Sequence, residues 1–179
     1  YLLDGVQRAR QAGSYERAAS LLERREHLLE RLDLEDRRRY RVQNWIAHGE
    51  LLTATGDDRD ARKWATRAIE TARANRHLGE LADALRLRAA LRRESTDLKA
   101  ALEDIERAIE LYRQRGDRSG LARARYIKGR IHQMRGESAD AESAYVEAME
   151  YFDEVGDDSM RALITCDIGY NWVTQGRQE

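Results

Sequence analysis

The fold of this chain is decided by residues 96–111, which read TDLKAALEDIERAIEL. The apolar side chains of this stretch recur at steps of three and four residues, which puts them on one face of a helix: Leu98, Ala101, Ile105, Ala108 and Leu111. A β-strand would need apolar and polar residues in strict alternation, and the stretch lacks that pattern. The spacing therefore predicts an amphipathic helix that buries its apolar face against a neighbour.

Small residues recur around this stretch with a period of 40 residues. A first marker stands at Gly49, Ala89, Gly129 and Gly169, and a second marker follows seven residues later at Gly56, Thr96, Gly136 and Gly176. Alanines follow at Ala61, Ala101 and Ala141, and again at Ala68, Ala108 and Ala148. Each period predicts a first helix that ends near the second marker, a tight turn, a second helix and a Gly-Asp connection, as at Gly116–Asp117 and Gly156–Asp157. The result is a stack of antiparallel helix pairs with about nine helices.

The composition agrees with an all-α chain. Charged residues make up 36% of it, hydrophobic residues 41% and aromatic residues only 7%, and proline is absent. This balance, with no β-branched runs, disfavours sandwiches, barrels and doubly wound sheets. The formal net charge of −1 removes a general attraction to nucleic acid or to anionic membranes, so neither is an expected partner.

The single cysteine, Cys166, rules out an internal disulfide and favours a reducing, cytoplasmic setting. Apolar runs are too short to cross a bilayer. The chain lacks an initiator methionine and a signal-peptide pattern, so we expect it to be a piece of a longer protein.

Several of these stretches resemble the tetratricopeptide repeat (TPR). Residues 96–111 resemble its second helix almost position for position, and residues 136–151 repeat the pattern with Ala141, Tyr145 and Ala148. First helices are indicated by Trp45 with Gly49 and by Ile168 with Gly169 and Trp172, and residues 13–18 resemble a less regular turn and second helix. The 40-residue period is similar to that of kinesin light chains, spindle adaptors and bacterial signalling regulators.

The resemblance implies a right-handed α-solenoid. It also implies a non-catalytic scaffold for protein–protein interaction, which binds a peptide or protein partner in a concave groove and belongs to a larger bacterial regulatory protein. It covers the chain as a single array: an irregular repeat at 1–35, full repeats at 42–81, 82–121 and 122–161, and a lone first helix at 162–179. Two alternatives stay open. One is a peptide- or ligand-responsive sensor that controls an attached output domain, and the other is the accessory part of an enzyme.

The sequence departs from the family just before the first marker. An aliphatic residue is usual there, but only Ile168 conforms, and the other positions carry His48, Arg88 and Lys128. Either the first helices are rotated or long basic side chains pass over the seam between helices. The lysines and asparagines with which chaperone-binding members hold a carboxylate are not reproduced.

In such a superhelix the first helices line the concave side. We name the positions six and three residues before the first marker, and one, four and five after it, the groove stripe. In the second and third repeats its members are Gln43, Ile46, Glu50, Thr53, Ala54, Asp83, Arg86, Ala90, Arg93 and Glu94. Further along they are Arg123, Tyr126, Arg130, Gln133, Met134, Leu163, Cys166, Tyr170, Val173 and Thr174.

The middle of the groove stripe is basic, which suggests a site for an acidic peptide. Guanidinium groups bind carboxylates in bidentate fashion, and tyrosines are good anchors. The candidate peptide-groove residues are Arg86, Arg93, Arg123, Tyr126, Arg130 and Tyr170. The alternative is that these arginines form ordinary ion pairs with Glu94, Asp83 and neighbouring carboxylates.

Other candidate sites are weaker. The run Arg37–Arg41, with Trp45 nearby, has the chemistry for phosphates or an RNA loop, although the acidic residues before it favour a solvated helix start. The histidines are scattered over different repeats, Cys166 has no base near it in sequence, and glycine-rich phosphate loops are absent. We therefore expect no enzyme activity, metal or cofactor.

The last helix presents a separate surface. Ile164, Ile168 and Trp172 fall on one apolar face of a helix whose partner helix does not follow in the chain. We expect this face to be a docking site, with a symmetric homodimer as one possibility.

Overall fold

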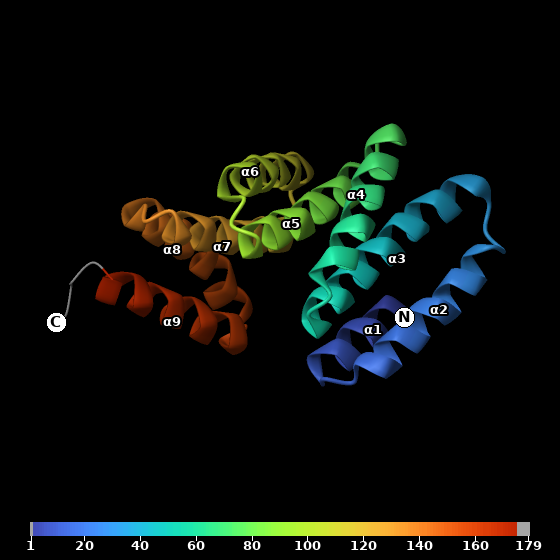
Figure 1. Cartoon of the computed structure of the whole chain (residues 1–179), viewed down its shortest axis with the longest axis horizontal. Coiled ribbons are helices and arrows are strands. Elements are labelled where there is room, and N and C mark those ends of the chain that lie inside the picture. Colours follow the sequence, from blue (N-terminus) through green and yellow to red (C-terminus); the bar gives the residue numbers. More distant parts are fainter. Residues whose placement is uncertain (1, 175–179) are drawn as a thin grey trace. The chain divides into compact units, whose positions relative to one another are not determined.

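The computed structural model describes residues 2–174, and within them the backbone forms nine α-helices and no β-strand (Figure 1). The prediction of an all-α chain with about nine helices is confirmed. In chain order the helices are α1 (Leu2–Gln11), α2 (Tyr15–Leu29), α3 (Leu34–Thr55), α4 (Asp58–Ala74), α5 (Leu78–Glu94), α6 (Leu98–Arg115), α7 (Arg118–Met134), α8 (Ser138–Val155) and α9 (Asp158–Thr174). The predicted marker Gly176 and the rest of 175–179 lie outside the described residues.

The predicted Gly-Asp connections are confirmed at two places. Gly116 and Gly156 end α6 and α8 in the left-handed conformation, with φ of 67° and 68°. The aspartate that follows each glycine caps the next helix: Asp117 Oδ1 accepts from Gly120 N (2.8 Å), and Asp157 Oδ1 accepts from Met160 N (3.1 Å). Because the aspartate caps at once, α7 and α9 begin at Arg118 and Asp158, ahead of the predicted boundaries 122 and 162. Helix α5 also begins early, at Leu78 and not at 82, after a turn that has no Gly-Asp pair.

The second marker ends the first helix of each pair. Gly56 and Gly136 have φ of 83° and 75°, the left-handed region that closes a helix at low cost only for glycine. Thr96 occupies the same position with φ of 61°, so a β-branched residue is held in a strained conformation there.

The first marker lets helices approach closely. A Cβ added to Gly129 on α7 would lie 2.6 Å from ring carbons of Tyr145 on α8, and one added to Gly49 on α3 would lie 2.6 Å from Leu87 Cδ2 on α5. The prediction that small residues mark close helix crossings is confirmed at these two positions.

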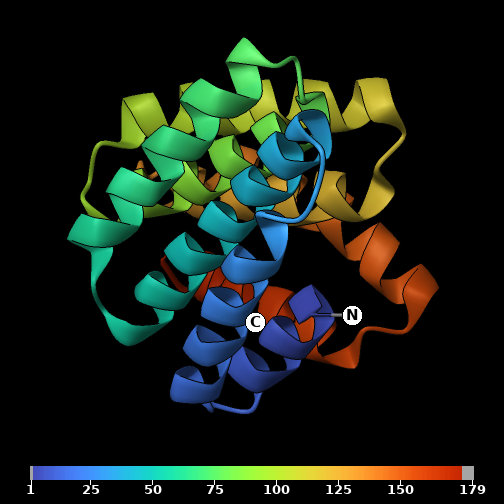
Figure 2. The same cartoon turned by 90° about the vertical axis from the view of Figure 1, so that its right-hand side faces the viewer.

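The chain divides into two compact units, Tyr1–Leu91 and Arg92–Glu179, with the boundary inside α5. In the first unit α1 and α2 form a hairpin (Figure 2), and α3 packs against both of them. A core cluster joins these helices, consisting of Val6, Ala9, Ala18, Leu22 and Leu51. The handedness of the predicted superhelix stays a prediction.

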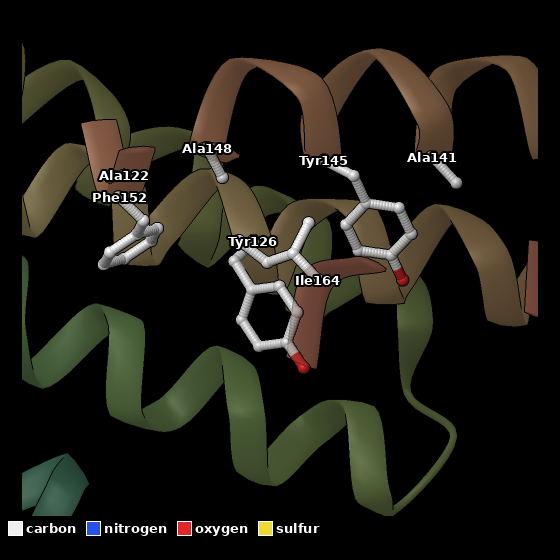
Figure 3. Close-up of a cluster of buried hydrophobic side chains, with 7 residues drawn as sticks. All are labelled: Ala122, Tyr126, Ala141, Tyr145, Ala148, Phe152 and Ile164. Carbon is white, nitrogen blue, oxygen red and sulfur yellow. The ribbon is translucent and has the colours of Figure 1, made fainter. Parts of the chain in front are cut away.

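The second unit is built around α7. Helix α8 packs along α7, α9 contacts both of them, and α6 covers another side of α7. Figure 3 shows the core cluster, in which alanines leave room for aromatic rings: Ala122, Tyr126, Ala141, Tyr145, Ala148, Phe152 and Ile164. The rings of Tyr126 and Tyr145 lie 6.0 Å apart between centroids, in a tilted pair.

Candidate functional site

A pocket of about 310 Å³ opens between α1, α3 and α5 in the first unit. Ten residues line it: Leu3, Val6, Gln7, Arg10, Gln43, Ile46, Ala47, Glu50, Asp83 and Arg86. Half of these are members of the predicted groove stripe, namely Gln43, Ile46, Glu50, Asp83 and Arg86. The structure therefore places five of the ten stripe residues of the second and third repeats on the wall of one pocket, and Thr53, Ala54, Ala90, Arg93 and Glu94 lie outside it.

Three charged residues from three helices meet in this pocket. Arg10 Nη1 on α1 donates to Glu50 Oε2 on α3 (2.7 Å), and Arg86 Nη2 on α5 donates to Glu50 Oε1 (2.9 Å). Burial raises the pKa of the Glu50 carboxyl, but the guanidinium groups of Arg86 and Arg10 outweigh it and hold that pKa below its ordinary value. Glu50 is therefore an ionised bridge that ties the three helices together.

The pocket lining also has apolar members. Val6 and Ile46 are 4% and 7% exposed, while Leu3 and Ala47 are half-buried. The charges on the lining balance, with Arg10 and Arg86 against Glu50 and Asp83. A surface of this kind suits a peptide residue with an uncharged aliphatic side chain, whose main-chain groups hydrogen-bond to the polar residues of the lining.

A buried polar network fixes the rim residue Gln43. Gln43 Nε2 donates to Glu80 Oε1 on α5 (2.8 Å), and Gln43 Oε1 accepts from Arg25 Nη2 on α2 (3.1 Å). Glu80 also accepts from Arg39 Nε (2.7 Å). Burial raises the Glu80 pKa, but the hydrogen bonds from Arg39 and Gln43 outweigh it, so the pKa lies below its ordinary value. The amide of Gln43 is therefore held in place before any ligand arrives.

The part of the pocket contributed by α1 was missed from the sequence, although a signal was present. If Gly13 is treated as a second marker, the first marker falls at Val6, and the stripe offsets then give Leu3, Gln7 and Arg10. All three line the pocket. The irregular spacing of this first repeat hid the relation.

Three of the four predicted groove arginines form ion pairs within the chain. Arg86 lies in the first unit and pairs with Glu50, whereas Arg93 and Arg130 lie in the second unit. Arg93 is only 9% exposed and pairs with Glu94, as the alternative interpretation expected. Arg130 Nε lies 3.8 Å from Asp167 Oδ2. Arg123, the fourth arginine, is exposed.

The predicted tyrosine anchors differ from each other. Tyr126 is only 8% exposed, and its hydroxyl donates to Asp167 Oδ2 (2.8 Å), so its role as an exposed anchor was wrongly predicted. Burial and the neighbouring Asp167 raise the pKa of Tyr126 to about 12. Tyr170, in contrast, is 63% exposed and available for contact.

The predicted self-association face was also wrong in part. Ile164 is fully buried beside Tyr126 in the core cluster (Figure 3), and Ile168 packs against the same cluster. Trp172 is exposed. Adjacent helical residues point about 100° apart, and the apolar residues that α9 exposes include Leu163, one position before Ile164.

The basic run Arg37–Arg41 lies near the start of α3, which begins at Leu34, as the alternative of a helix start expected, but it is not simply solvated. Arg37 Nη2 donates to the backbone oxygens of Glu30 and Leu32 (2.8 Å each), and Arg41 Nε donates to Glu26 Oε1 (2.7 Å). These guanidinium groups hold the end of α2 against α3, which leaves them engaged within the chain.

An aromatic cluster between α3 and α4 was not predicted. Trp45 and Trp64 lie 6.4 Å apart between ring centroids, His48 stacks on Trp64 at 5.2 Å, and the Arg67 guanidinium lies 4.2 Å from the Trp45 centroid. Burial lowers the pKa of His48. Two of the positions at which the sequence differs from the TPR pattern are thus engaged within the chain: His48 stacks on Trp64, and Lys128 forms an ion pair with Glu106 (3.2 Å).

One group of side chains in the described part of the chain has ligand atoms close enough for a metal ion. The atoms of His132, Glu137 and Asp140 lie within 4.8 Å of one another. His132 Nδ1 lies 2.6 Å from Glu137 Oε2, and Arg135 Nη2 lies 2.8 Å from Glu137 Oε1. Both carboxylates stand at the start of α8, where the helix dipole stabilises anions and opposes a cation. The group is therefore explained by an acidic helix start whose Glu137 is held by His132 and Arg135.

Comparison with protein-family models and with curated proteins finds no match for this chain. Among residues 2–174, no helix is both long enough and apolar enough to cross a membrane.

Proposed function

We propose that this chain is a non-catalytic protein-interaction module of the TPR kind, which binds a peptide segment of a partner protein between α1, α3 and α5. The observation that supports the proposal is the pocket itself. It combines apolar side chains, a fixed amide at Gln43 and a charge-balanced base, and it lies where the groove stripe predicts a ligand.

The pocket chemistry revises the expected ligand. Arg10 and Arg86 both pair with Glu50, and Asp83 completes the charge balance of the lining, so an acidic peptide would have to compete with an existing pair of ion bridges. Leu3, Val6, Ile46 and Ala47 instead offer apolar contact for one aliphatic side chain. The preferred ligand is therefore a peptide with a leucine-like residue, flanked by main-chain groups that hydrogen-bond to Gln7 and Gln43.

A random peptide library displayed on phage tests the proposal. Selection against the whole chain should enrich peptides with a shared aliphatic residue, and titration calorimetry should then measure their affinity. Leu3→Asp places a charge among the apolar lining residues and should weaken binding at least about tenfold, since burying a leucine-sized side chain contributes roughly 1.5 to 3 kcal/mol.

Leu28→Asp is the matched control. Leu28 is 40% exposed on α2 in the same unit and does not line the pocket, so this variant should bind like the unaltered chain. Circular dichroism checks that both variants are folded. Selected peptides that bind Leu3→Asp with full affinity, or a selection that enriches no peptide, would overturn the proposal.

A further inference from the structure

The first unit has a second pocket, of about 220 Å³, between α2, α3 and α4. We call it the tryptophan pocket, because the aromatic cluster forms much of its lining. Seven residues line it: Glu26, Arg41, Asn44, Trp45, His48, Trp64 and Arg67. None of them lines the pocket between α1, α3 and α5, so the tryptophan pocket is a separate site.

The carboxylate of the tryptophan pocket is already bonded. Glu26 Oε1 accepts from Arg41 Nε (2.7 Å), and Glu26 Oε2 accepts from Asn44 Nδ2 (2.8 Å). Asn44 is 1% exposed, and its Oδ1 accepts from Arg25 Nη1 (3.2 Å). Glu26 is thus held and charge-compensated by its neighbours, which makes it a poor partner for a cationic ligand.

The Arg67 guanidinium, in contrast, has aromatic neighbours and no acceptor. Its central carbon lies 4.2 Å from the Trp45 ring centroid and 5.9 Å from the Trp64 centroid. Among residues 2–174, no carboxylate or carbonyl oxygen accepts a hydrogen bond from it. A cation–π contact holds a guanidinium beside a ring without using its N–H groups on an acceptor. Arg67 is therefore a positioned cation whose donors suit an anion.

A comparison of two repeats shows what Arg67 lacks. Arg125 and Glu147 stand 80 residues after Trp45 and Arg67, and these two side chains form an ion pair with 2.9 Å between Arg125 Nε and Glu147 Oε2. In the earlier repeat an indole stands where that ionic partner stands. An acceptor for Arg67 therefore comes from outside the chain.

Charge and size select the kind of ligand. Arg41 is paired with Glu26, which leaves one unpaired charge on the lining, that of Arg67. Burial lowers the pKa of His48, so its ring adds no charge at pH 7. A planar carboxylate supplies the single negative charge and matches the guanidinium fork. The volume lies below the roughly 300 to 1,000 Å³ of pockets for drug-sized ligands, which favours a ligand with one ring.

We propose that the tryptophan pocket binds a small aromatic monocarboxylate. The carboxylate pairs with Arg67, and the ring packs against Trp45 and Trp64, whose own rings are tilted by 38° with centroids 6.4 Å apart. Such a ligand satisfies the donors of Arg67 and covers aromatic surface together. It adds a small molecule to the ligands of the interaction module.

Titration with benzoate, followed through the indole N–H signals in a proton–nitrogen correlation spectrum, tests the site. The chain has three tryptophans, and their substitution by phenylalanine one at a time assigns the signals. Benzoate should shift the signals of Trp45 and Trp64 and leave that of Trp172 unchanged, with a dissociation constant on the order of 1 mM. Benzyl alcohol, which lacks the charge, and acetate, which lacks the ring, should each bind at least about tenfold more weakly.

Arg67→Gln removes the charge that the carboxylate needs and should weaken benzoate binding at least about tenfold. Arg107→Gln is the matched control: Arg107 holds the same repeat position 40 residues later, pairs with Glu110 and does not line the tryptophan pocket. It should bind benzoate like the unaltered chain. Circular dichroism checks that both variants fold.

Three results would overturn the site. These are unshifted Trp45 and Trp64 signals up to about 20 mM benzoate, equal affinity for benzyl alcohol, or full affinity in Arg67→Gln. If library peptides shift these two signals and benzoate does not, the pocket takes a peptide and the small-molecule proposal is wrong. The two pockets share no residue, so this test and the peptide-binding test succeed or fail independently.

Discussion

Single residues at the turns carry measurable strain. Thr96 has a φ of 61° at a position where the equivalent residues of the neighbouring periods are Gly56 and Gly136. A β-branched residue in the left-handed region costs about 1 to 2 kcal/mol, whereas glycine adopts it readily. The side chain of Thr96 is exposed, so its removal loses little packing.

Thr96→Gly should therefore stabilise the chain. We expect the free energy of unfolding, measured by urea denaturation, to rise by about 0.5 to 1 kcal/mol, since the relief of strain exceeds the entropy that glycine adds to the unfolded chain. The reverse change Gly136→Thr, made where a side chain would meet nothing within 4 Å, should lower it by a similar amount. Equal stabilities for Thr96→Gly and the unaltered chain would remove the strain argument.

Glu50 is the residue on which three helices depend. Glu50→Gln removes the charge between Arg10 and Arg86 and should lower the free energy of unfolding at pH 7 by about 2 kcal/mol. The Glu50 pKa lies below its ordinary value of 4.5 in the folded chain, so its stabilising effect is present above that value. It is lost as the pH falls through the folded pKa, and the difference between variant and unaltered chain should shrink accordingly.

Glu110→Gln is the control for this change. Glu110 forms an exposed pair with Arg107 on α6, and such pairs contribute less than about 1 kcal/mol. If Glu50→Gln lowers the free energy of unfolding no more than Glu110→Gln does, the ion pairs of Glu50 with Arg10 and Arg86 do not stabilise the packing of the three helices.

At the scale of helices, the effect of a side chain at the first marker depends on whether a neighbouring helix packs against that position. Gly129 lies against Tyr145, but Gly169, 40 residues later at the same marker, faces open space. Identical substitutions at the two positions should therefore have opposite effects.

Gly129→Ala should lower the free energy of unfolding by about 1 to 3 kcal/mol because its methyl group would overlap the Tyr145 ring. Gly169→Ala should raise it by about 0.5 to 1 kcal/mol, since alanine favours a helix and meets no neighbour. Urea denaturation of both variants beside the unaltered chain measures the two changes. A destabilising Gly169→Ala would show that α9 is covered there in solution.

The number and order of the helices could be predicted from the sequence, because the residues that repeat every 40 positions meet backbone requirements of the turns between helices. Gly116 and Gly156 must adopt positive φ, and Asp117 and Asp157 must cap, so these connections were predictable from residue type alone. Side-chain partners were not. Glu50 binds Arg10 and Arg86, which are 40 and 36 positions away, and nothing local in the sequence selects these pairs.

The exposed side of α9 shows the same limit. A residue step turns a helix by about 100°, so an error of one position exchanges a core residue for a surface residue. Ile164 was assigned to the surface and is buried, whereas Leu163 is exposed. Only the packing of α9 on α7 and α8 distinguishes the two.

At the scale of the whole molecule, charge is abundant but balanced. The 32 basic and 33 acidic residues give a net charge of −1, and the arginines in the pocket are already bridged. Peptide binding should therefore be driven by apolar contact rather than by long-range attraction.

The affinity of a selected peptide should change less than about twofold between low and high salt, because screening acts mainly on exposed, unpaired charges. Titration calorimetry at several salt concentrations measures this. A strong loss of affinity in salt would instead favour the acidic ligand that the basic groove stripe first suggested.

The central claim is that a peptide binds between α1, α3 and α5, and methyl NMR spectroscopy tests it most directly. Addition of a selected peptide should shift the methyl resonances of Leu3, Val6 and Ile46, which line the pocket, while Leu28 and Val146 outside it stay unchanged. Shifts confined to residues outside the pocket, with those three methyl groups unaffected, would contradict the account.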